Sequence, residues 1–76
     1  MNKIRRKAIA EIAEQIATLR EELEALQEEE QDYMDNMPEN LQGSERYEAA
    51  ESAVDNLESA LDSLDEALDY MEEAQA

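Results

Sequence analysis

Large apolar residues recur at alternating steps of three and four through the first half of the chain. They are Ile9, Ile12, Ile16, Leu19, Leu23 and Leu26, followed after an interruption at Glu30 by Tyr33 and Met37. This spacing places apolar side chains along one side of a helix, at the positions written a and d in a heptad. The pattern therefore predicts a helix over about residues 3–36 with a single apolar seam.

The second half of the chain repeats the pattern. Its apolar positions are Tyr47, Ala50, Val54, Leu57, Leu61, Leu64, Leu68 and Met71. They predict a second helix over about residues 44–74. At about 1.5 Å per residue, each run of roughly 30 residues would form a helix about 45 Å long.

The segment "NMPENLQGSERY" separates the two runs and holds the only proline and the only glycine of the chain. Pro38 disfavours helical geometry at Met37 and has no amide proton to donate, so the first helix should end nearby. Gly43 would supply backbone freedom in a turn over about residues 37–43. Ser44 is a suitable N-cap for the second helix.

A connection this short makes consecutive helices antiparallel neighbours. The predicted fold is therefore all-α, a single domain over residues 1–76 formed by an antiparallel two-helix hairpin of coiled-coil type. The predicted facing pairs are Leu26 with Leu57, Leu23 with Leu61, Leu19 with Leu64 and Ile12 with Met71. The same register would set the basic segment Lys3–Lys7 beside the acidic C-terminal segment "DYMEEAQA".

A single hairpin of this length has little interior in which to bury apolar surface. We therefore expect a second copy, which would give a four-helix bundle, or a partner protein that covers the remaining apolar surface.

Charge narrows the range of partners. The chain has 22 acidic and 6 basic residues, for a net charge of −16. Such a chain repels nucleic acid and anionic membranes and favours partners with a basic surface. No apolar run approaches the roughly 20 residues needed to span a bilayer, so a soluble, cytoplasmic protein is expected.

Histidine and cysteine are both absent. Their absence excludes disulfides, thiolate metal sites and the common nucleophile–base pairs. The acidic clusters "EEEQD" and "DSLDEALD" lack the loop and glycine of a calcium site. We expect no enzymatic activity, no cofactor and no specific metal site.

The heptad of the second helix separates small residues from acids. Position g holds Ala53, Ala60, Ala67 and Ala74, which we call the alanine strip. The strip would let a further helix approach closely, although alanine also has the highest intrinsic helix propensity and needs no packing role to occur there. Positions b and e hold eight carboxylates, which we call the acidic face: Glu48, Glu51, Asp55, Glu58, Asp62, Asp65, Asp69 and Glu72.

Two interpretations of the acidic face stay open. It is either a solvated face or a binding surface whose carboxylates, about 5–6 Å apart, stand in for nucleic-acid phosphates. Tyr70 lies off the apolar seam and would add an aromatic contact, whereas Tyr47 belongs to the seam near the turn.

The opening "MNKIRRK", the segment "DNMPENLQGSERYEAAESAVDNLESALDSLDEALDYMEEA" and the length resemble a group of small acidic proteins. These proteins are encoded by phages and integrated mobile elements of Gram-positive bacteria. Small acidic phage proteins often inhibit the nucleic-acid-binding machinery of the host, including CRISPR effectors, by occupying basic channels. The resemblance implies a bacterial host cell and transfers no catalytic or binding residue.

Three functional hypotheses follow. In the first, the acidic face engages a basic surface of a host protein, as a nucleic-acid mimic that inhibits a DNA-binding defence effector in an anti-CRISPR-like way. In the second, the chain is a structural module in which the seam and the alanine strip mediate oligomerisation. In the third, it is a DNA-associated accessory protein that acts through Lys3–Lys7.

Overall fold

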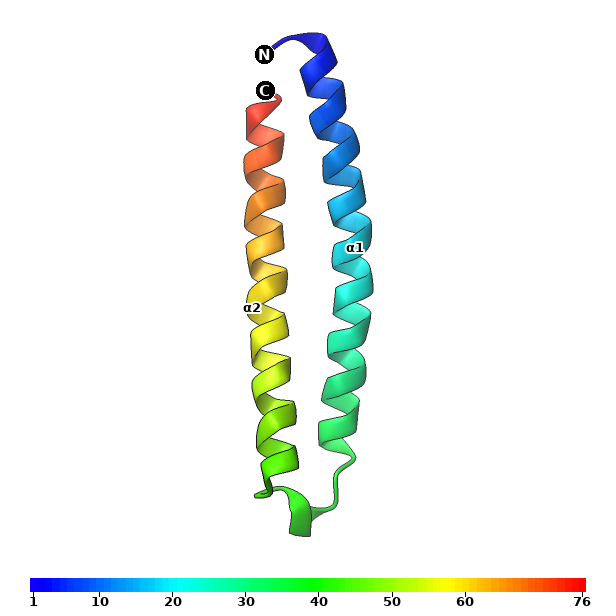
Figure 1. The fold of residues 1–76 in the computed structure, drawn as a ribbon, viewed down its shortest axis with the longest axis vertical. Helices are drawn as coiled ribbons and strands as arrows, with labels where there is room; N and C mark the ends of the chain where they lie inside the picture. The colour runs from blue at the N-terminus through cyan, green and yellow to red at the C-terminus, as the bar shows by residue number, and fades with distance from the viewer.

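Two long helices make up nearly the whole molecule. The computed structural model describes residues 1–76 and contains α1 (Lys3–Asp35), the short 3-10 helix η1 (Glu39–Leu41) and α2 (Glu45–Ala74). The long helices lie side by side and run antiparallel, so that both termini sit at one end and the turn at the other (Figure 1). The molecule extends 59 × 15 × 13 Å. The predicted antiparallel helical hairpin is confirmed.

Side chains at the helix ends satisfy exposed backbone groups. The Asn2 side chain accepts a hydrogen bond from the Arg5 amide at 2.8 Å and caps the start of α1. At the start of α2, the Ser44 hydroxyl accepts from the Tyr47 amide at 3.3 Å. The Asn36 side chain donates to the Asp32 carbonyl at 2.8 Å, where α1 ends. These contacts replace bonds that the helix ends cannot make internally.

Pro38 stops the chain from continuing α1. Its backbone is extended, with φ −56° and ψ 145°, and its carbonyl accepts from the Leu41 amide at 2.9 Å to form the turn of η1. Gly43 contributes less than its sequence context suggested. It does not adopt a positive φ, and a Cβ atom added there would meet nothing within 4 Å. The turn therefore depends on Pro38 and Ser44 and does not require glycine.

The core of the hairpin is small and lies toward the turn half of the molecule. Its buried side chains are Met34, Met37, Ala50, Val54 and Leu61. The seam predicted for α2 faces α1, because its other members are half-buried. They are Tyr47, Leu57, Leu64, Leu68 and Met71. No helix is both long enough and apolar enough to cross a membrane.

The seam predicted for α1 is confirmed at position a and wrong at position d. The residues of α1 that are buried or half-buried are Ile9, Ala13, Ile16, Arg20, Leu23, Gln27, Glu30 and Met34, with Glu24 and Gln31 beside them. They follow positions a and e, so the helix is rotated from the predicted a and d seam. Ile12, Leu19 and Leu26 are instead 50%, 60% and 56% exposed.

Polar contacts account for this rotation. The Arg20 guanidinium donates to the Asp65 carboxylate, and the Gln27 amide donates to the Val54 carbonyl at 3.3 Å. Both contacts require position e of α1 to face α2. The predicted facing of Ile12, Leu19 and Leu26 with residues of α2 is therefore lost. We call Ile12, Leu19, Leu26 and Tyr33, which all occupy position d, the outer apolar row.

Candidate interaction surfaces

The acidic face lies open along α2. Seven of its eight carboxylates are exposed and form no ion pair: Glu48, Glu51, Asp55, Glu58, Asp62, Asp69 and Glu72. Asp65 is the exception, because it is half-buried and accepts from Arg20 Nε at 2.8 Å and from Arg20 Nη2 at 3.1 Å. Most of the predicted face is therefore available to a partner.

Arg20 makes both ion pairs of the chain. Besides Asp65 on α2, its guanidinium contacts Glu24 one turn further along α1. Hydrogen bonds to Asp65, which have the larger effect, and to Glu24 raise the pKa of Arg20. The side chain therefore stays charged and joins the two helices on the flank that carries the acidic face.

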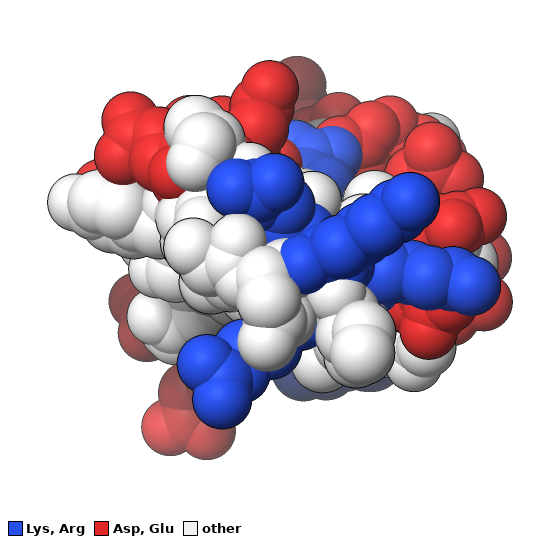
Figure 2. Space-filling model, turned by 90° about the horizontal axis from the view of Figure 1, so that it is seen from above, with Lys and Arg blue, Asp and Glu red and all other residues white.

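The basic residues near the N-terminus are free. Lys3, Arg5, Arg6 and Lys7 lie at the end of the molecule that carries both termini, where basic side chains gather with acidic ones around them (Figure 2). The predicted placement of this cluster at the acidic C-terminal end is thus observed. None of the four side chains forms an ion pair there.

The alanine strip lies on the opposite flank from Asp65. Ala53, Ala60 and Ala67 are half-buried and Ala74 is exposed. Arg46, which shares position g with the strip, donates from Nη2 to the Tyr33 hydroxyl at 2.7 Å. Its guanidinium carbon also lies 5.9 Å from the centre of the Tyr33 ring, a cation–π distance. This contact places the outer apolar row beside the alanine strip.

Tyr70 does not share a row with the acids. It occupies position c of α2, next to position g on the helical wheel, and its side chain is 70% exposed. Glu66, Asp69 and Glu73 surround it in a shallow hollow. Tyr70 therefore lies at the border between the alanine strip and the acidic residues.

The outer apolar row is a surface that was not predicted from the sequence. A signal for it was present in α2, where positions c and g carry no charge from Ala49 to Ala74. Position c holds Ala49, Asn56, Ser63 and Tyr70, and position g holds the alanine strip. In a chain with 22 acidic residues, two neighbouring rows without charge indicate a flank that is suited to contact with another protein.

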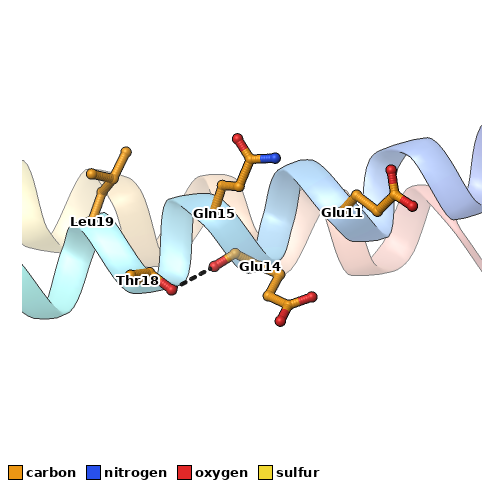
Figure 3. A pocket seen from close by; sticks show the side chains of 5 residues that line it. All are labelled: Glu11, Glu14, Gln15, Thr18 and Leu19. Atoms are coloured by element: carbon orange, nitrogen blue, oxygen red, sulfur yellow. Dashed lines mark hydrogen bonds between the residues drawn. The ribbon is translucent and has the colours of Figure 1, made fainter.

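The hollows of the surface are shallow. The largest is lined by Glu11, Glu14, Gln15, Thr18 and Leu19. All five side chains come from α1 and project in different directions, so no second element closes the hollow (Figure 3). Another hollow, beside the turn, is lined by Tyr33, Asn36, Met37, Pro38, Leu41 and Arg46. No group of three or more carboxylates is placed to hold a metal ion.

Comparison with protein-family models, with curated proteins and with solved structures finds no match to this chain.

Proposed function

We propose that this protein is a non-enzymatic binding protein that acts as a dimer and engages a basic surface of a host protein through its acidic face. The observation that carries this proposal is that seven of the eight carboxylates of that face are exposed and unpaired. A basic surface on a partner would supply the positive charges that these carboxylates lack within the chain.

The acidic face is unfavourable for the isolated hairpin. Neighbouring carboxylates three or four residues apart on a helix repel each other by roughly 0.2–0.5 kcal/mol per pair. Lysines between them would remove this cost, yet α2 contains no lysine and its one arginine, Arg46, contacts Tyr33. A basic partner would relieve the repulsion, so binding is expected to be driven by electrostatics and weakened by salt.

The charge density of the molecule favours mimicry of nucleic acid. A net charge of −16 over 59 Å amounts to about one charge per 4 Å. Two copies side by side would carry about one charge per 2 Å, close to the value of about 1.7 Å for duplex DNA. A protein channel that binds DNA would therefore meet a similar density of negative charge. The preferred target is a DNA-binding defence effector of a bacterial host.

The competing function is an oligomerisation module with no inhibitory role. The exposed outer apolar row favours it, because this row needs a partner whether or not the acidic face does. The two functions differ in what charge reversal on the acidic face would do.

The test replaces Asp55, Asp62 and Asp69 with lysine. A matched control replaces Glu14, Glu21 and Glu28, which are exposed on α1, with lysine and changes the net charge equally. Proteins captured from a bacterial extract by the wild type and by the control, lost with the Asp55→Lys/Asp62→Lys/Asp69→Lys variant and displaced by added duplex DNA would support the proposal. Identical capture by all three proteins would exclude the acidic face as the binding surface. Failure of DNA to compete would exclude mimicry.

A further inference from the structure

We infer that the outer apolar row is the contact surface for a second copy of this chain, packed antiparallel so that the turn of each hairpin lies beside the termini of the other. This inference rests on the dimer proposed above and adds to it the face, the orientation and the register.

The orientation of α1 is the first argument. On the side that faces α2, this helix carries Arg20 and Gln27. Its Leu19 and Leu26 are more than half exposed. A helix with a single neighbour would bury its leucines against that neighbour. In a four-helix bundle each helix contacts two neighbours and the bundle interior. The d row of α1 points where the second layer of such a bundle would lie.

On α2, the rows nearest the outer apolar row carry no charge from Ala49 to Ala74. The contact between Tyr33 and Arg46 shows that position d of α1 lies on the same side as position g of α2. Next to the outer apolar row are therefore the alanine strip and the uncharged c row, Ala49, Asn56, Ser63 and Tyr70. The acidic face lies beyond position e, on the other flank. Two copies can meet on this flank, bordered on α1 by Glu22 and Glu29 of position g, while both acidic faces stay outside.

The outer apolar row is complementary to itself in the antiparallel sense. When α1 packs against α1 of the second copy, Leu19 faces Leu26 and Ile12 faces Tyr33. The residue numbers of both pairs add to 45. Large apolar side chains outside the hairpin core thus oppose one another in one register.

Charge at the two ends favours the antiparallel arrangement. The basic cluster Lys3–Lys7 lies at the terminal end, where it forms no ion pair (Figure 2). Antiparallel packing sets it beside the turn of the second copy, where Asp35 and Glu39 are exposed. Parallel packing would bring the two basic clusters together and leave both turns acidic.

The size of the flank suits a stable dimer. A face 59 Å long and 15 Å wide offers roughly 900 Å² per copy, compared with about 800 Å² per partner in a typical specific interface.

The test uses cysteine cross-linking, which is clean because the chain has no cysteine. Ile12→Cys and Tyr33→Cys variants are mixed and oxidised, and the disulfide-linked dimers are identified by mass spectrometry. A predominant link between residues 12 and 33 is the expected result. Predominant links between two copies of residue 12 would overturn the antiparallel arrangement while leaving the dimer and the acidic face intact.

A second measurement addresses the surface itself. Leu19→Glu with Leu26→Glu should weaken dimerisation by at least about 100-fold, because four carboxylates would be buried without partners. The control, Ser52→Glu with Ser59→Glu, adds the same charge at exposed positions of α2. Sedimentation equilibrium gives the affinities, and circular dichroism checks that the helices persist. A monomeric wild type, or equal dimerisation of both variants, would overturn the inference, whereas binding through the acidic face is tested separately by the Asp→Lys variant.

Discussion

Arg20 joins the two helices through a single side chain. It is the only cation between Lys7 and the turn, and its guanidinium reaches both Asp65 on α2 and Glu24 on its own helix. Because the side chain must lie between the helices to do so, it fixes which side of α1 faces α2. The same geometry turns the neighbouring Leu19 outward.

Gly43 provides a test of the turn at the level of one residue. Because its φ is not positive and the space around it is open, Gly43→Ala should be tolerated. We expect it to raise the free energy of unfolding by about 0.4–1 kcal/mol, since alanine restricts the unfolded chain more than glycine does. Thermal denaturation followed by circular dichroism measures the change.

Ser44→Ala is the matched comparison in the same segment. It removes the hydroxyl that caps α2 and should cost about 1 kcal/mol. A Gly43→Ala variant as unstable as Ser44→Ala would mean that the turn needs glycine after all.

The two helices differ in how well their sequence predicts their packing. In α2, the apolar seam is bordered by carboxylates at position e on one side and by alanine on the other, so only one orientation buries the leucines. In α1, the seam at a and d is bordered at position e by Ala13, Arg20, Gln27 and Met34, none of which is acidic. Periodicity defines the stripe but not which edge of it meets a neighbour. The contacts of Arg20 and Gln27 with particular atoms of α2 could not be derived from spacing.

Leu61 and Leu26 should respond differently to truncation. Leu61 is 4% exposed within the hairpin, so Leu61→Ala should cost about 2–5 kcal/mol and lower the Tm at every protein concentration. In the proposed dimer the partner of Leu26 belongs to the second copy, so Leu26→Ala should lower the Tm only at concentrations where dimers form. Denaturation over a hundredfold range of concentration distinguishes the two. Equal effects of both substitutions in dilute solution would show that Leu26 belongs to the core of the hairpin.

At the scale of the whole molecule, the acidic face of α2 and the outer apolar row of α1 lie on different flanks. The exposure of the acidic face could be predicted, because carboxylates at b and e cannot turn inward without partners. The outer apolar row could not, because it arises only when one helix is rotated against the other. The proposed second copy and the proposed basic partner would therefore contact different flanks and would not compete.

Because the acidic face has few cations near it, dissolved salt is what reduces the repulsion among its carboxylates. The net charge is −16, and only Arg20 forms ion pairs, so repulsion should outweigh attraction among the charges. Raising the NaCl concentration from 0.01 to 1 M shortens the screening length from about 30 to about 3 Å. We expect the Tm to rise by about 5–10 °C, since relief of even about 1–2 kcal/mol of repulsion has this effect in a domain of this size.

The Glu14→Lys/Glu21→Lys/Glu28→Lys variant serves as the control for this prediction. It changes the net charge from −16 to −10, because each substitution removes one negative charge and adds one positive charge. Its Tm should therefore rise less with salt than that of the wild type. A wild-type Tm that fell with salt would mean that the ion pairs of Arg20 and the free basic cluster outweigh the repulsion. The acidic face would then be stable without a partner, and the repulsion argument for a basic target would fail.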